Sequence, residues 1–453
     1  MKLNNWTSQK IVSPSMESPG EYKHGENHKV QQSIKLSVVT QFFPPDYAAT
    51  GQLIEELVKQ LEKEGVSIEV FTSQPGYAFS LSKAPYLESV DKIKIQRSRS
   101  AQLFPGRIRG KLINGILYTL RSFVYLLKAS RRSNLLLVTT APPFLPIVAY
   151  FTNLLFKLPY VCIIYDLYPD IVISLGIVSK NHWVAKLWQA VNQRVWLNAK
   201  GIVVLSPEMK QRVLEYCPQV GHKVSVIHSW ANPELIVPIA KKENWFAWKH
   251  NLVNKFTVLY SGNMGRCHDI DTLLKAAIEL QNESVQFVCI GGGARREELI
   301  AKVNQLGLNN FTFLPYQDKK DLPYSLTASD LSLVSVNPSS ESLVLPSKLY
   351  SALAAGRPLA VVCSPYSSLR QLIGEAQCGA AFNHGDGHGL AEFIRLLQSN
   401  QQLGQQMGKA ARQYLQTHFT PEIISQQYLE VFRQALNMED SRNVECRYKT
   451  LHS

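Results

Sequence analysis

A glycine-containing turn near the middle of the chain has residues suited to binding phosphate. The run 260–266 (Y-S-G-N-M-G-R) lies between a strand-like and a helix-like stretch and contains Gly262, Gly265 and Arg266. Glycines let a backbone approach a ligand, free helix amides attract an anion, and a guanidinium can bind two phosphate oxygens at once. The turn has neither the Walker ending nor the GxGxxG spacing of dinucleotide folds, so it could also be only a tight turn.

A second candidate phosphate contact lies at the start of a helix predicted over 347–355. Pro346 and Ser347 are typical of a helix start, and Gly356 is typical of a helix end. Lys348 would then lie in the first turn, where the helix dipole disfavours a cation unless an anion is bound. We therefore expect Lys348 to contact a phosphate, the alternative being a merely exposed side chain.

Nearer the N-terminus, two segments could receive a second substrate. In the run 43–51 (F-P-P-D-Y-A-A-T-G), Thr50 and Gly51 place small groups at a predicted helix start, where a ligand could approach. Asp166 and Asp170 follow a buried strand at its carboxyl end, where an acid could orient an acceptor hydroxyl or act as a base. For Asp170 a helix or turn cap is the alternative.

Strand-like runs and helical patterns alternate along nearly the whole chain, in two series. The first series has strands over 34–40, 67–72, 135–138, 160–165, 201–205 and 223–227, with helices over 51–64, 111–128, 146–156 and 182–198. The second has strands over 256–261, 285–290, 312–313, 331–336 and 359–362, with helices over 271–281, 295–306, 322–328 and 347–355. Such alternation predicts an α/β protein of two doubly wound, Rossmann-like domains. Ligands are expected in the cleft between them, at the carboxyl ends of the strands.

The chain of 453 residues exceeds what one core usually organises, and we divide it accordingly. We expect a disordered leader over 1–33, a first domain over 34–228, and a linker with a second domain over 229–420. A helix over 421–437 is expected to pack back on the first domain, and 438–453 to be a frayed tail. The leader is polar and lacks the apolar core of a secretory signal.

Composition limits the partners. The net charge of +13 points to an anionic partner, which could be nucleic acid, anionic lipid or a phosphorylated small molecule. No helix-turn-helix, RNA-recognition or zinc pattern is present, so nucleic acid is not favoured. The seven cysteines are scattered without a CxxC pair, which favours reduced thiols over disulfides or a metal site.

A basic stretch over 92–132 also carries apolar residues at helical spacing within 113–127. A basic helix with an apolar face suits an anionic membrane surface, but the same face could instead be buried in the domain core. Both interpretations remain open, because periodicity does not show which face is covered. The charge-free run 133–156 is long enough for a membrane span, yet its prolines favour a buried strand, a turn and a helix.

Several of these motifs together resemble a known family. The runs I-G-G-G (290–293), F-L-P-Y (313–316) and A-S-D (328–330), with the order of elements over about 34–436, are similar to retaining glycosyltransferases of family four with the GT-B fold. The runs 262–265 and 346–349 resemble a branch found in exopolysaccharide and O-antigen (lipopolysaccharide) assembly.

The resemblance implies a metal-independent, hexosyl-type transferase without a cofactor, which uses a nucleotide diphosphate sugar and retains the anomeric configuration. It also implies a saccharide or polyprenyl-linked acceptor, and a cytoplasmic protein that could be peripheral at the inner face of the plasma membrane. The implied catalytic residues are Asp166, Arg266 and Lys348, with Thr50, Gly51 and Asp170 near the acceptor. The implied donor contacts are Gly262, Asn263, Gly265, His268, Gly292, Tyr316 (at the base), Ser347, Leu349 and Ser351.

Four positions depart from the pattern of that family. Many members carry an Arg after the first loop glycine and a Lys several residues on, where this chain has Asn263 and His268. They also carry two glutamates eight positions apart, where this chain has Leu343 and Ser351, with Glu341 only nearby. The alternative function is therefore a non-catalytic GT-B protein that binds nucleotide sugar or lipid as a partner in an assembly complex.

Overall fold

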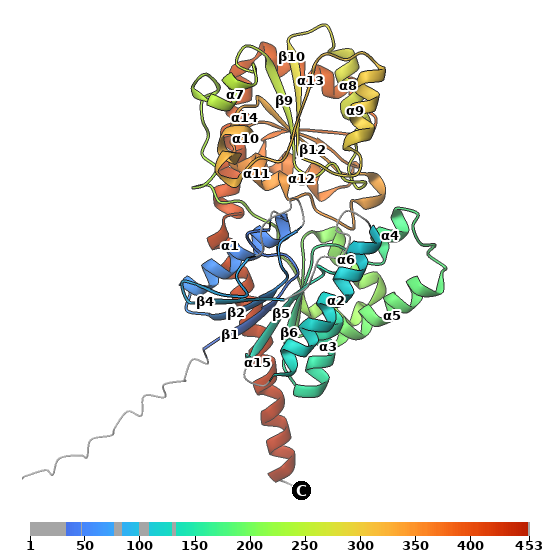
Figure 1. Cartoon of the computed structure of the whole chain (residues 1–453), viewed down its shortest axis with the longest axis vertical. Helices are drawn as coiled ribbons and strands as arrows, with labels where there is room; N and C mark the ends of the chain where they lie inside the picture. Colours follow the sequence, from blue (N-terminus) through green and yellow to red (C-terminus); the bar gives the residue numbers. More distant parts are fainter. Residues whose placement is uncertain (1–32, 47, 77–83, 99–107, 129–132, 452–453) are drawn as a thin grey trace, which may run out of the picture. The chain divides into compact units, whose positions relative to one another are not determined.

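The computed structural model describes residues 33–46, 48–76, 84–98, 108–128 and 133–451, so the expected leader over 1–33 lies almost wholly outside it. Two sheets organise the described chain (Figure 1). The first has the strand order β3-β4-β2-β1-β5-β6-β7-β8, and all its neighbours are parallel except the β3–β4 pair. Its strands are β1 (Lys35–Val39), β2 (Ser67–Thr72), β3 (Leu87–Val90), β4 (Ile93–Arg97), β5 (Leu135–Thr139), β6 (Tyr160–Ile164), β7 (Gly201–Val204) and β8 (Val224–Val226).

Helices connect the strands of the first sheet. They are α1 (Ala49–Lys63), α2 (Ile108–Leu127), α3 (Leu145–Phe156), α4 (Asp170–Ser174), α5 (Trp183–Asn198) and α6 (Pro207–Tyr216), with a 3₁₀ helix η2 (Pro218–Lys223) before β8. Every residue of β5, β6 and β7 is buried, as expected for parallel strands covered on both faces. The charge-free run 133–156 forms β5, a turn and α3, which confirms the strand–turn–helix prediction.

The β3–β4 hairpin was not predicted. It lies inside the stretch that the sequence indicated only as basic, and Val90 pairs directly with Ile93 across a two-residue turn. Asp91 in that turn has a φ of 54°, a value at which short polar residues are tolerated. The alternation of buried Ile93 and Ile95 with exposed lysines is the period of a half-buried strand.

The second sheet has the order β11-β10-β9-β12-β13-β14, and all its strand pairs are parallel. Its strands are β9 (Phe256–Ser261), β10 (Val285–Ile290), β11 (Phe311–Leu314), β12 (Leu331–Ser335), β13 (Leu359–Val362) and β14 (Gly379–Phe382). The direction of winding reverses between β9 and β12, and such a switch point is where ligands bind in this class of sheet.

Further helices accompany the second sheet. They are α7 (Trp245–Lys249), α8 (Asp271–Glu279), α9 (Arg296–Gln305), α10 (Leu322–Thr327), α11 (Lys348–Ala354), α12 (Ser368–Ala376), α13 (Gly387–Ser399) and α14 (Gln401–His418). Three 3₁₀ helices also occur: η3 (Lys241–Glu243), η4 (Lys319–Asp321) and η5 (Pro338–Ser340). The predicted strand series ended at residue 362, whereas the structure adds α12 and β14, a short strand whose Gly-Ala-Ala-Phe sequence has little apolar signal.

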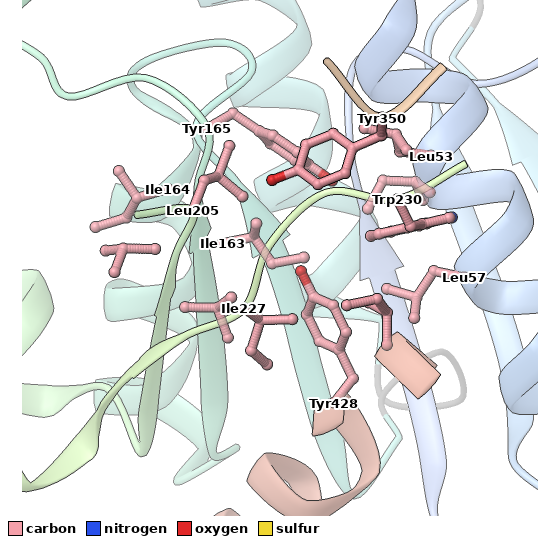
Figure 2. Packing of buried hydrophobic residues seen from close by; sticks show 14 of the residues in the cluster. Leu53, Leu57, Ile163, Ile164, Tyr165, Leu205, Ile227, Trp230, Tyr350 and Tyr428 are labelled. Atoms are coloured by element: carbon pink, nitrogen blue, oxygen red, sulfur yellow. The ribbon is translucent and has the colours of Figure 1, made fainter. Parts of the chain in front are cut away.

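The last helix, α15 (Pro421–Leu451), packs against α1, β6 and β7 of the first sheet. Tyr428 of α15 lies among buried residues of that sheet, edge-on to Trp230 (Figure 2). Gly201 permits this approach, because a Cβ atom there would lie 2.8 Å from Val431. The helix continues past residue 437, where the sequence analysis expected it to end, and no glycine or proline follows Pro421 to stop it.

None of the helices in the described parts of the chain combines the length and the apolar character needed to cross a bilayer.

Candidate active site

A cleft of about 590 Å³ is lined by residues that follow strands of both sheets. From the first sheet come residues of the β1–α1 connection, including Thr50, and of the segment after β6, including Asp166. From the second sheet come the ends of β9 and β10, Tyr316 after β11, and the start of α11. The cleft therefore lies where the predicted arrangement of carboxyl-terminal strand ends expects a ligand.

Lys348 is the most informative cation in this cleft. It is the first residue of α11, it is half-buried, and its Nζ donates to the hydroxyl of Tyr260 at 2.5 Å and to the carbonyl of Asn263 at 3.2 Å. The Nζ atom also lies 3.8 Å from the centre of the Tyr260 ring. Within the described chain no carboxylate forms an ion pair with Lys348, and burial lowers its pKa to about 7. A cation without a counter-ion in a cleft is suited to binding an anionic ligand.

Glycines bring the loops after β9 and β10 into contact beside Lys348. The Gly262 amide donates to Ile290, and the Met264 amide donates to Gly292. Gly291 has a φ of 126°, and a Cβ atom there would lie 2.2 Å from the Gly262 carbonyl oxygen. The glycine run is thus a close contact between two loops, and Gly262, Asn263 and Ile290 of these loops line the cleft.

His268 lines the same wall and is neutral. Its Nδ1 lies 2.8 Å from the carbonyl oxygen of Ser335, which can only accept, so Nδ1 carries the hydrogen. Burial, and then the charge of Lys348, lowers the pKa of His268 to about 3. The remaining nitrogen, Nε2, is therefore a hydrogen-bond acceptor at neutral pH.

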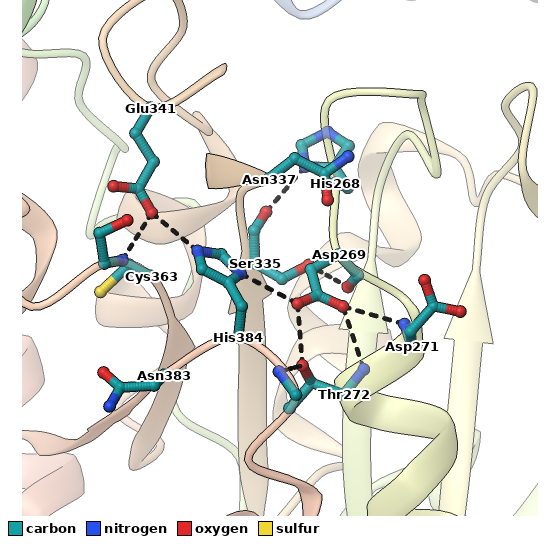
Figure 3. A network of polar contacts seen from close by, with 12 residues as sticks. His268, Asp269, Asp271, Thr272, Ser335, Asn337, Glu341, Cys363, Asn383 and His384 are labelled. Atoms are coloured by element: carbon teal, nitrogen blue, oxygen red, sulfur yellow. Dashed lines mark hydrogen bonds and ion pairs between the residues drawn. The ribbon is translucent and has the colours of Figure 1, made fainter. Parts of the chain in front are cut away.

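A network of polar contacts lies next to His268 (Figure 3). His384 contacts Asp269 at 3.0 Å through Nδ1 and Glu341 at 3.1 Å through Nε2. Asp269 also accepts from the amide and hydroxyl of Thr272, and its own carbonyl accepts from Ser335. Glu341 accepts from the Ser364 amide and is not among the residues that line the cleft. The network therefore joins the segment of His268 to the segment before α11.

On the opposite wall, Asp166 lies at the carboxyl end of β6. Its amide donates to the Thr140 hydroxyl at 3.3 Å, whereas no hydrogen bond to its carboxylate is found among the described residues. Burial raises the pKa of Asp166 to about 6. The neighbouring amide of Leu167 donates to the Leu343 carbonyl at 3.3 Å, so the Asp166 segment touches the segment that leads into α11.

The structure brings most of the predicted site residues to this cleft. The predicted residues among its lining are Thr50, Asp166, Gly262, Asn263, His268, Tyr316, Ser347, Lys348 and Ser351. Gly265 and Gly292 are not among the lining residues and act through packing. A Cβ atom on Gly265 would lie 2.9 Å from Asn263 Nδ2, and one on Gly292 would lie 3.1 Å from the Tyr316 ring.

Four further predicted residues are not among the cleft lining. Asp170 is buried against α6, where its Oδ1 accepts from Arg212 Nε at 2.9 Å and from the Tyr216 hydroxyl at 2.7 Å. Gly51 lies inside α1, where a Cβ atom would lie 2.9 Å from the Phe42 carbonyl carbon, so it permits close packing.

Arg266 is exposed on its loop, with its carbonyl bound to Asn337. Leu349 is fully buried, and its amide already donates to the Pro346 carbonyl. In each of these four cases the residue type fits the predicted role, and only its orientation or packing removes it from the cleft.

Glu56 of α1 is a charged residue on the cleft wall that the sequence motifs did not indicate. Glu56 accepts from Trp230 Nε1 at 3.1 Å, and Lys319 of η4 lies 3.8 Å from its other carboxylate oxygen. Burial raises the pKa of Glu56 above its usual range. These residues are far apart in the sequence and belong to no local motif, so no signal in the sequence indicated them.

Comparisons with known proteins agree with this geometry. The family model of group 1 glycosyl transferases matches residues 241–414, and that of the glycosyl transferase 4-like domain matches residues 49–230. The chain is 23% identical over 378 residues to the probable glycosyltransferase WbjE of Pseudomonas aeruginosa, covering 80% of this chain and 88% of that protein. It is 28% identical over 214 residues to the putative colanic acid biosynthesis glycosyl transferase WcaI of Escherichia coli, covering 46% of this chain and 52% of that protein.

Two solved structures share the fold at low sequence identity. Sucrose-phosphate synthase from Thermosynechococcus elongatus superposes with a TM-score of 0.72 at 18% identity, covering 89% of this chain and all of that one. Anabaena HepE, solved in complex with UDP and glucose, superposes with a TM-score of 0.66 at 14% identity, covering 88% of this chain and 99% of that one. The two family models divide the chain between the two sheets, and the fold agrees. The chain therefore belongs to the group 1 glycosyltransferases, family four, whose members have the GT-B fold, use nucleotide sugars, retain configuration and are typically metal-independent.

Proposed function

We propose that this chain transfers a sugar from a nucleotide diphosphate sugar to a lipid-linked saccharide, in the synthesis of a cell-surface polysaccharide at an anionic membrane. One observation carries the proposal. Lys348 forms no ion pair and the Asp166 carboxylate accepts no hydrogen bond among the described residues, and the two line the same cleft from the two sheets. This pairing fits a diphosphate on one wall and a hydroxyl group on the other.

In this proposal the second sheet binds the donor. The ammonium group of Lys348 contacts the diphosphate, and the loop of Gly262 and Asn263 lies beside it. Tyr316 flanks the base, and the free Nε2 of His268 accepts from a sugar hydroxyl. Negative charge develops on the departing diphosphate, so a fixed cation at that position lowers the barrier.

The acceptor is proposed to bind against the first sheet. Above a pH of about 6 the Asp166 carboxylate is ionised and can accept a hydrogen bond from the attacking hydroxyl. Thr50, on the same wall, adds a small polar group at the start of α1. Asp166 thus orients the acceptor without a contact to the donor phosphates.

The test uses the full chain with a panel of nucleoside diphosphates and their sugars. A nucleotide that binds the native state raises the melting temperature by several degrees near 100 Kd, where linkage contributes about 2.7 kcal/mol. Release of free nucleoside diphosphate in the presence of a lipid-linked saccharide then measures turnover. The proposal would be rejected if no nucleotide raised the melting temperature and no nucleoside diphosphate were released.

A non-catalytic nucleotide-sugar binder is the second candidate, and one observation favours it. Leu343 is buried and Ser351 lines the cleft at the two places where many family members carry glutamates. Glu341 does not replace them, because it is bound to His384 and the Ser364 amide. Nucleotide binding without turnover of any donor offered would support this candidate.

A further inference from the structure

The helix α2 is amphipathic in an unusual sense, because its apolar stripe faces outward. Leu112, Ile113, Ile116, Leu120, Val124 and Leu127 are exposed along one face of the helix. The opposite, buried face carries Gly115, Tyr118 and Ser122. The structure thus settles the question that periodicity left open: most of this apolar face is not part of the domain core.

Two neighbouring helices extend this apolar face. Figure 1 shows α2, α3 and α5 on one side of the first sheet, and α3 contacts both of the others. Their exposed large apolar side chains include Leu120 (59% exposed), Val124 (56%), Leu155 (59%), Trp183 (68%) and Leu187 (55%). Exposed apolar side chains that gather on neighbouring helices and are bordered by polar residues are typical of an interaction surface.

The charges on this face are all of one sign. Between Asp91 and Glu208 the only carboxylates of the sequence are Asp166 and Asp170, one in the cleft and the other buried against Arg212. The helices and their ends instead carry exposed cations: Arg121, Lys128, Lys157, Lys186 and Arg194. Among the described residues none of these cations forms an ion pair.

We propose that the exposed faces of α2, α3 and α5 form a docking surface for a membrane that contains anionic lipids. Apolar side chains enter the boundary between headgroups and acyl chains, while lysines and arginines contact the headgroups. A second copy of the chain is a poorer occupant. A symmetric contact would bring like charges together, with no carboxylate to oppose them.

The docking surface reaches the acceptor side of the cleft. Trp188 of α5 stacks on Tyr168, with ring centres 5.6 Å apart, and on Phe144 at 4.9 Å. Tyr168 lines the cleft together with Asp166. This inference deepens the proposed function, because a lipid-linked acceptor in the bilayer would enter the cleft from this side.

The experiment is co-sedimentation of the full chain with phosphatidylcholine vesicles, with and without phosphatidylglycerol. We expect binding to the anionic vesicles, weakened by salt because the headgroup attraction is screened. The double variant Leu120→Asp/Leu155→Asp should bind about tenfold less, since each change removes an inserted group and adds a repelled charge. The matched control is Leu306→Asp/Leu396→Asp, which changes two leucines, each 47% exposed, that belong to the second-sheet half. It should bind as the wild type does.

A milder variant changes only exposed charges, so a loss of binding would not be due to misfolding. Lys186→Gln/Arg194→Gln keeps the apolar face and should weaken binding about fivefold for each charge. The proposed docking surface would be rejected if the wild-type chain did not bind to anionic vesicles. It would also be rejected if light scattering showed a dimer of the wild-type chain that dissociates in the Leu120→Asp/Leu155→Asp variant. Vesicle binding needs no turnover, so a chain that binds vesicles but uses no donor would retain this inference and reject the enzymatic proposal.

Discussion

The two walls of the cleft differ in how their charged groups are paired. Next to the second-sheet wall, the carboxylates of Asp269 and Glu341 are bound to His384, and Lys348 on that wall forms no ion pair with a carboxylate of the described residues. On the first-sheet wall the situation is reversed, because within the described part of the chain no group donates a hydrogen bond to the Asp166 carboxylate. One wall is therefore preorganised for an anion and the other for a hydroxyl donor, which suggests different effects for changes on each.

The walls also differ in their construction and surroundings. The loops after β9 and β10 are joined by backbone hydrogen bonds and by a glycine contact that no side chain could occupy. The first-sheet half instead has an apolar, basic outer face on α2, α3 and α5. A fixed pocket suits a small polar donor, whereas an apolar exterior suits an acceptor that comes from a lipid phase.

The largest effect is expected for Lys348→Met, which keeps the length of the side chain but removes its charge. We expect kcat/KM to fall about 10²–10³-fold, because the leaving diphosphate loses its cation. Steady-state kinetics with the active donor would measure it. The control is Lys319→Met, since Lys319 lines the same cleft but already lies near Glu55 and Glu56. An equal fall in kcat/KM in both variants would contradict a special role of Lys348.

Asp166→Asn should affect turnover rather than donor binding. We expect kcat to fall about 10²-fold with the donor dissociation constant nearly unchanged, because Asp166 acts on the acceptor hydroxyl. The wild-type rate should also decline as the pH falls through about 6, where the carboxylate takes up a proton. A variant that keeps the wild-type rate and pH profile would exclude Asp166 from the reaction.

Asp170→Asn tests the contrast between the two acids that follow β6. Asp170 accepts from Arg212 and Tyr216, so its loss should lower the free energy of unfolding by about 1–3 kcal/mol, a range reduced because Arg212 is partly exposed. Urea denaturation would measure this change. Turnover of the folded variant should match the wild type, and a large fall in kcat without a loss of stability would return Asp170 to the site.

The smallest effect is expected in the pH dependence of donor binding. The pKa of Lys348 is lowered to about 7 in the free protein, and a bound diphosphate favours the charged form and raises the pKa again. Above pH 7, Lys348 must therefore take up a proton when the donor binds. The affinity for the donor should then fall by up to about tenfold per pH unit. Calorimetric titrations at several pH values would show it, and Lys348→Met should abolish the slope.

Local patterns predicted much of this molecule. Alternating apolar runs indicated two doubly wound sheets, a predicted strand end placed Asp166 and a predicted helix start placed Lys348, and both residues line the cleft. These predictions succeeded because hydrophobic periodicity and helix-start residues act over a few neighbours in the chain. The β3–β4 hairpin was missed because its basic residues masked a short alternating pattern.

The sequence by itself determined the order of elements and the chemistry of the side chains available to the cleft. Only the tertiary structure decided that Asp170 pairs with Arg212, that Arg266 stays exposed, and that the apolar face of α2 is uncovered. The physical reason is that periodicity describes one element alone. Which face is buried, and which charge finds a partner, depends on residues that are distant in sequence and meet only in the folded chain.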